Sequence, residues 1–94
     1  ELSSPDAEIR FEAAVACGEL GEEGAVSYLV KLVDDLDTQV RLSAIAALGK
    51  IGGSEAEAAL RECLNHPNEY IRQAAEEAMA ELVFDKDPLS FELF

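Results

Sequence analysis

Apolar side chains recur at steps of three and four residues in the first part of the chain. The first set consists of Ile9, Ala13, Ala16, Cys17 and Leu20. This spacing places the set on one face of an α-helix, and the same spacing returns twice further along the chain. We therefore predict three equivalent helices, called A helices, which begin after Asp6, Asp37 and Asn68. Each of these side chains can accept hydrogen bonds from the free amides of a first helical turn.

The A helices correspond to one another at a constant shift of 31 residues. Two of the most regular triplets are Arg10, Arg41 and Arg72, and Ala13, Ala44 and Ala75. A fixed period of roughly 20 to 50 residues is typical of stacked repeats, in which each unit buries its apolar face against its neighbours. Small side chains on these helices allow close packing, so we expect Ala47→Phe to overpack the contact by about 1 to 3 kcal/mol.

A second helix, called the B helix, is predicted in the first two copies, over roughly 24–35 and 55–65. Its apolar stripe in the first copy is Val26, Leu29, Val30, Leu32 and Val33. Ser54 with Glu57 matches a capping box at the start of the second B helix. Glycine accepts the left-handed backbone geometry of a tight turn. The pairs expected to end the first two A helices in this way are Gly18 with Gly21, and Gly49 with Gly52.

These elements predict an all-α fold, an α–α superhelix of about three stacked helix pairs with the last pair incomplete. We expect one domain over 1–94. Its parts are the end of a preceding helix at 1–5, repeat 1 at 6–36, repeat 2 at 37–67, a partial repeat 3 at 68–84 and a C-terminal tail at 85–94. The first residue is Glu1 rather than Met, which we interpret as a fragment or a processed chain. The apolar tail predicts a lid over the last A helix, or alternatively a docking peptide or an oligomer contact.

Two segments carry a resemblance to a known family: DAEIRFEAAVACGELGE followed by AVSYLVKLV, and DTQVRLSAIAALGKIGG followed by AEAALRECL. With the partial third copy they resemble the HEAT repeat family, in particular its short form, the PBS lyase HEAT-like repeat. The resemblance covers about residues 6 to 82. It implies an α-solenoid in which the A helices lie outside and the B helices line the inner, ligand-facing side.

The same resemblance implies a structural role for the arginine triplet. In such repeats Arg10, Arg41 and Arg72 would pair with aspartates of adjoining units as a ladder. The alternative is a pair within each helix start, four residues apart, with the partners Asp6, Asp37 and Asn68. Both alternatives predict that the arginines stabilise the stack.

Charge narrows the class of partner. The chain has 7 Lys and Arg against 20 Asp and Glu, a formal net charge of −13. This charge repels a phosphate backbone, so we predict no nucleic-acid partner. No apolar run is long enough to span a bilayer, and we predict no membrane partner. The acidic field indicates either solubility alone or steering of a basic protein partner.

Residues with catalytic or metal-binding chemistry are few. His66 is the only histidine, so no second imidazole is present to complete a metal site. We therefore predict a surface-loop residue rather than a metal ligand. Cys17 and Cys63 occupy positions that are apolar in the other copies. They predict buried free thiols in a reducing compartment, and therefore a cytoplasmic location. We predict no enzyme activity, no cofactor and no metal.

The exposed edge of the B helices is the predicted partner-binding surface. Its candidate residues are Ser27, Tyr28, Lys31, Asp34, Asp35, Glu62 and Asn65. Tyr28 is the candidate anchor because tyrosine often has this role at interfaces, although it can also simply shield the stack. The predicted function is a non-catalytic scaffold that presents this surface to a protein or peptide. The resemblance implies one alternative, a subunit or fragment of an enzyme that handles a bilin chromophore, like the phycobilin lyases.

Overall fold

The structure is a computed structural model that describes residues 5–86. Its elements in chain order are α1 (Ala7–Leu20), the short 3-10 helix η1 (Glu23–Ala25), α2 (Val26–Leu32), α3 (Thr38–Ile51), α4 (Ser54–Cys63) and α5 (Glu69–Lys86). Every element within residues 5–86 is helical, which confirms the predicted all-α class. The segments 1–4 and 87–94, which include most of the predicted preceding helix and of the tail, lie outside the described residues.

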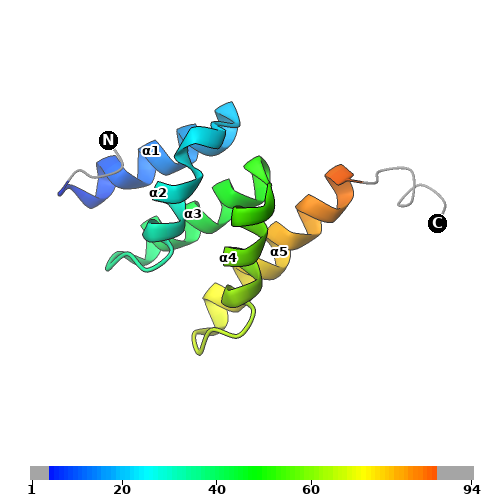
Figure 1. The fold of residues 1–94 in the computed structure, drawn as a ribbon. Helices are drawn as coiled ribbons and strands as arrows, with labels where there is room; N and C mark the ends of the chain where they lie inside the picture. The colour runs from blue at the N-terminus through cyan, green and yellow to red at the C-terminus, as the bar shows by residue number, and fades with distance from the viewer. Residues whose placement is uncertain (1–4, 87–94) are drawn as a thin grey trace.

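The helices form two layers. The A helices α1, α3 and α5 pack side by side, and the B helices α2 and α4 lie across them (Figure 1). The core is the space between the layers, and its largest fully buried side chains are Leu29, Ile45, Leu48, Leu60, Ile71 and Val40. Equivalent positions share one environment: Leu29 and Leu60 are both fully buried, as are Val40 and Ile71. The 31-residue period is therefore the period of the packing.

All three A helices begin with the predicted side-chain cap. Asp6 accepts a hydrogen bond from the amide of Glu8 at 2.9 Å, and Asp37 accepts one from Val40 at 3.1 Å. Asn68 Oδ1 accepts from the amide of Tyr70 at 2.8 Å. Because each cap occupies an otherwise unpaired amide, the start of every A helix is set by local sequence.

Only half of the glycine prediction is confirmed. Gly21 ends α1 in the left-handed conformation, with φ +68°, and Gly52 ends α3 with φ +77°. Gly18 and Gly49 lie inside the helices, so the prediction that they form the turns is wrong. A Cβ atom on Gly18 would come within 2.9 Å of both Cα and Cβ of Ala47. These two glycines therefore allow adjacent A helices to approach closely.

Gly49 makes the equivalent contact one repeat later. A Cβ atom there would lie 2.7 Å from Cβ of Ala78 and 2.9 Å from its Cα. The pairs Gly18 with Ala47 and Gly49 with Ala78 are separated by the same 31 residues. Both interfaces between A helices thus use one close-packing device, a glycine on the leading helix against an alanine on the following helix.

The B helices differ from the prediction at their ends. α2 and α4 are shorter than 24–35 and 55–65, because residues after Leu32 and Cys63 form turns. The capping box at Ser54 is wrong: Ser54 is already helical, and the N-cap residue is Gly53, whose φ is +97°. No side chain caps this helix, so its start depends on the glycine turn that follows α3 rather than on a serine cap.

Candidate partner-binding surfaces

The predicted arginine ladder contains one bidentate ion pair. Arg10 Nε donates to Asp35 Oδ2 at 2.8 Å, and Arg10 Nη2 donates to Asp35 Oδ1 at 3.0 Å. The same Oδ1 also accepts from the backbone amide of Asp37 at 2.9 Å. Asp35 therefore connects the start of α1 to the loop that leads into α3. Both side chains are largely covered, with 16% of Arg10 and 9% of Asp35 exposed.

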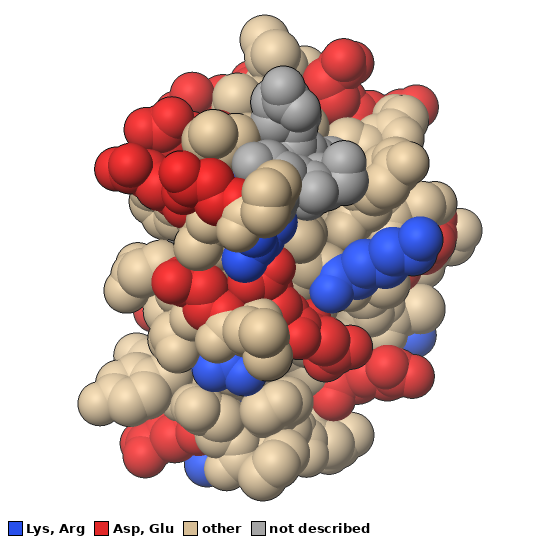
Figure 2. Space-filling model, turned by 90° about the vertical axis from the view of Figure 1, so that its left-hand side faces the viewer, with Lys and Arg blue, Asp and Glu red and all other residues tan. Residues whose placement is uncertain are grey.

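Electrostatics agree with this geometry. The hydrogen bond from Arg10 holds the pKa of the Asp35 carboxyl below its usual value, against the opposing effect of burial. Figure 2 shows the side of the molecule on which α1 begins, where Asp and Glu groups predominate and smaller Lys and Arg patches lie between them. The carboxylate of Asp35, a candidate for partner binding, is thus engaged within the protein at both oxygens.

The second junction between repeats lacks this pair because His66 stands at the position of Asp35. His66 Nδ1 accepts from the amide of Asn68 at 2.9 Å, as Asp35 does from Asp37. A neutral imidazole cannot also accept the fork of an arginine. Arg41 instead donates to Thr38 Oγ1 at 3.2 Å, and its buried Nε has no hydrogen-bond partner among residues 5–86. His66 is therefore a partly buried loop residue with a capping role.

The third arginine uses backbone acceptors. Arg72 Nη1 donates to the carbonyl oxygens of His66, at 2.7 Å, and Pro67, at 3.0 Å. The three arginines therefore have three different acceptors: a carboxylate in the loop before α3, a hydroxyl in the first turn of the same helix, and two carbonyls in the loop before α5.

The remaining candidates on the B helices differ in their surroundings. Ser27 Oγ is 3.4 Å from each carboxylate oxygen of Glu55, which connects α2 to α4. Tyr28 is 53% exposed, and Nζ of Lys31 lies 5.5 Å from its ring centroid, a cation–π distance. These two side chains form a small exposed unit. Asn65 is exposed in the turn after α4.

Asp34 and Glu62 meet at a hollow between the two B helices. The hollow measures about 130 Å³ and is lined by Val30, Val33, Asp34, Ala59, Glu62, Cys63 and His66. Burial, followed by the charges of Asp34 and Glu62, raises the pKa of the Cys63 thiol, so this cysteine is held as a thiol rather than a reactive thiolate. Cys63 is buried, Cys17 is partly buried, and both are free.

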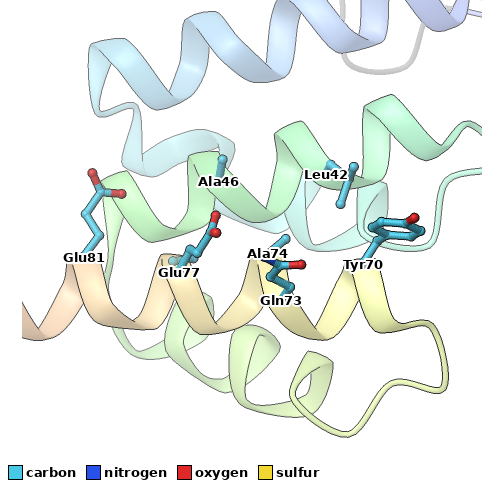
Figure 3. A pocket seen from close by; sticks show the side chains of 8 residues that line it. Leu42, Ala46, Tyr70, Gln73, Ala74, Glu77 and Glu81 are labelled. Atoms are coloured by element: carbon cyan, nitrogen blue, oxygen red, sulfur yellow. The ribbon is translucent and has the colours of Figure 1, made fainter.

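A larger groove lies between α3 and α5, which the sequence did not predict. It measures about 380 Å³ and is lined by Leu42, Ala46, Tyr70, Gln73, Ala74, Glu77, Ala78 and Glu81. In Figure 3 the side chains of Tyr70, Glu77 and Glu81 stand along α5 and point toward α3, while α4 lies behind. The groove is therefore on the A-helix side of the molecule. Its floor is apolar, and Tyr70 at one end is 71% exposed.

The sequence contained one signal for this groove. Tyr70 occupies the position of Gln39 in the second copy, where the exposed face of an A helix has a polar residue. A large aromatic side chain at a solvent-facing position is a common feature of interaction surfaces. The family resemblance instead implies a ligand-facing side on the B helices.

Comparison with known proteins identifies the fold family. A protein-family model described as HEAT repeats matches residues 1–80. No curated protein matches the chain. Within residues 5–86, no three His, Cys, Asp or Glu side chains are grouped so that they could hold a metal ion. None of the described helices has the length and apolar character needed to cross a membrane.

Proposed function

Because the chain belongs to the HEAT repeat family, we propose that it is a non-catalytic scaffold that presents a rigid helical surface to a protein or peptide partner. Repeats of this kind commonly mediate protein–protein interaction, although a fold alone does not specify a partner. The observation that supports the proposal here is the open groove between α3 and α5, with Tyr70 exposed beside an apolar floor. Exposed tyrosines beside apolar pockets are frequent anchors in interfaces.

Rigidity of the scaffold favours this function. The walls of the groove are two helices whose contact is set by Gly49 against Ala78, a backbone-to-backbone approach without flexible side chains. Leu48 and Ile71 fix the same helices from the core side and are fully buried. A preformed surface orders few groups on binding, so little conformational entropy opposes the association.

The finer assignment stays a proposal. The 31-residue period and its glycines support the PBS lyase HEAT-like form of the repeat, and a role in bilin handling is the alternative function that this form implies. No described side chain specifically favours bilin chemistry. Mixing the protein with a bilin and recording its absorption spectrum distinguishes the two: a shifted band supports the alternative, and an unchanged band supports the scaffold.

The scaffold is tested by affinity capture with the full chain, followed by identification of the captured proteins. We compare Tyr70→Ala, in the groove, with Tyr28→Ala, the exposed tyrosine of α2, as a matched control. Loss of a partner with Tyr70→Ala alone supports the groove, and loss with Tyr28→Ala alone supports the B-helix surface. Capture that is unchanged in both variants removes the two tyrosines as anchors and places the partner elsewhere on the chain. No capture by the wild-type chain contradicts the scaffold proposal.

A further inference from the structure

The two interfaces between A helices provide an internal comparison for the groove. Shifting each residue by 31 positions places Phe11 and Val15 of α1 over Leu42 and Ala46 of α3. The leading helix therefore has smaller side chains at the second interface. Between α1 and α3 the space is divided into two hollows, one of about 260 Å³ beside Phe11 and one of about 60 Å³ beside Val15. Between α3 and α5 it forms one groove of about 380 Å³. The backbone contacts at the two glycines are alike, so we attribute the continuous groove at the second interface to the smaller side chains of Leu42 and Ala46.

The following helix changes in chemistry at the same positions. Ser43 of α3 corresponds to Ala74 of α5, and Lys50 corresponds to Glu81. A polar floor with a cation at its end thus becomes an apolar floor with an anion at its end. Glu77 adds a second carboxylate to this end of the groove, and among residues 5–86 no Lys or Arg lines it. The negative charge of Glu77 and Glu81 is therefore not balanced by a basic residue of the groove lining.

The groove has a definite length and direction. Tyr70, Ala74, Glu77 and Glu81 follow one another along α5 at steps of four, three and four residues. At a rise of about 1.5 Å per residue they span roughly 16 Å, or three helical turns. The end at Tyr70 and Leu42 is apolar, and the end at Glu77 and Glu81 is acidic (Figure 3). A ligand that matches both ends must combine apolar and positively charged groups over that length.

We propose that the groove between α3 and α5 binds a basic amphipathic α-helix of a partner protein, with apolar side chains against Leu42 and Ala74 and Lys or Arg against Glu77 and Glu81. This inference rests on the proposed scaffold function and specifies its partner. Helices bind grooves through anchors about one turn apart, which suits a groove of three turns. A second copy of the chain is a poor occupant, because two molecules of net charge −13 repel each other.

The test uses a labelled peptide, AKLAAKLAKKAAKA, whose leucines and lysines share adjoining faces of a helix, and a control peptide with Glu in place of each Lys. Fluorescence anisotropy with the full chain gives the dissociation constants. We expect the basic peptide to bind and the acidic one not to bind, with affinity that falls as salt rises. Amide shifts in NMR spectra should centre on Leu42, Ala46 and Ala74. Equal binding of both peptides, or no binding of the basic one, overturns the proposal.

Two protein variants locate the site. Glu77→Lys with Glu81→Lys reverses the charge at the acidic end of the groove. The affinity for the basic peptide should fall at least about tenfold, which corresponds to a loss of roughly 1.4 kcal/mol of binding free energy. The matched control is Glu12→Lys with Glu19→Lys, which makes the same change of net charge on the exposed surface of α1. We expect less than about a threefold loss there. Equal losses in the two variants would mean that binding depends only on net charge, which contradicts a specific groove.

A third variant blocks the groove without changing its charge. Ala46 is exposed at the groove wall, so the phenyl ring of Ala46→Phe should fill the groove. We expect the affinity for the peptide to fall about tenfold while the melting curve of the protein stays unchanged. Retained affinity would place the peptide elsewhere. The groove and the scaffold function can fail independently. If a partner is captured through Tyr28 but the peptide does not bind, the scaffold function is retained and only the groove proposal is overturned.

Discussion

The first and second junctions between repeats have the same packing contacts and different polar contacts. At both junctions a helical glycine faces an alanine, Gly18 with Ala47 and Gly49 with Ala78. The loop residue beside the arginine differs: Asp35 pairs with Arg10 at the first junction, whereas His66 leaves Nε of Arg41 without a hydrogen bond among residues 5–86 at the second. The backbones of adjacent A helices are so close at these contacts that a side chain in place of the glycine would not fit. A polar residue in the loop can change with only a small effect on the free energy of unfolding.

The two ends of the A layer differ in a related way. On α1, Ile9 is 40% exposed, although its equivalents Val40 and Ile71 are buried against a preceding helix. On α5, the outward positions that correspond to Ile45 and Gly49 are Glu76 and Ala80. Glu76 and Ala80 are exposed, whereas Ile45 and Gly49 are buried. Within residues 5–86 the buried positions of α5 therefore serve its contacts with α3 and α4.

The largest expected effect comes from overpacking the first junction. Ala47 is 2% exposed and touches Gly18, so Ala47→Phe should lower the free energy of unfolding by about 3 kcal/mol, the upper part of the range for overpacked cores. Urea denaturation measures the change. Ala46→Phe, one residue earlier on the exposed face, is the control and should change stability little. Similar losses in both variants would contradict the assignment of the two faces.

The second junction is tested by Gly49→Ala. The new Cβ atom would lie within 3.0 Å of three atoms of Ala78, two of them in the backbone, so we expect a net loss of about 1 to 2 kcal/mol. In an uncrowded helix this substitution stabilises by about 1 kcal/mol, so even the sign is informative. Gly24→Ala is the control, because a Cβ atom there would meet nothing within 4 Å. A gain of stability at Gly49 would mean that the helices are further apart than described.

The ion pair of the first junction is tested by pH. Asp35→Asn should lower the free energy of unfolding at pH 7, where the carboxylate is charged and accepts from Arg10. Because the folded pKa of Asp35 is lowered from 3.8, its contribution is fully present above that value and is lost as the pH falls through the folded pKa. Thermal unfolding of both proteins should therefore converge only below pH 3.8. A difference that persists at lower pH would contradict an ionic origin.

The smallest expected effect converts the second junction into the first. His66→Asp places a carboxylate at the position equivalent to Asp35, where we expect it to reach Arg41, the equivalent of Arg10. The new side chain can still accept from the amide of Asn68, as Asp35 accepts from Asp37. We expect a gain of about 0.2 to 1 kcal/mol, the usual range for an accessible ion pair. The same substitution combined with Arg41→Met should give no gain. If the gain persists in that background, it does not come from the pair.

Elements with local causes were predictable from the sequence. The A helices and their caps at Asp6, Asp37 and Asn68 follow from periodicity and from side chains that bond two or three residues away. Predictions that depended on distant neighbours failed or were not made. Gly18 was assigned to a turn because its partner, Ala47, is a full repeat away and cannot be identified from the turn residues alone. Ser54 was assigned as a cap although the preceding glycine turn already starts the helix.

The candidate groove shows the same division. Sequence reasoning named Tyr28 and the B-helix edge, and the structure places those residues without testing their role. The groove between α3 and α5 combines residues about 30 positions apart, such as Ala46 and Ala74, whose joint effect is an empty space. No single residue in that set is unusual for a helix surface except Tyr70. The groove is formed jointly by the facing surfaces of α3 and α5. It can therefore be identified only when the relative positions of the two helices are known.

By itself the sequence determined that this protein stacks helices at a period of 31 residues, since apolar spacing and capping act within a few residues along the chain. The tertiary structure decided which glycines lie at the contacts between helices, which carboxylate pairs with Arg10, and where a groove remains between α3 and α5. Those outcomes depend on distances between segments a whole repeat apart, which folding sets and local sequence does not encode.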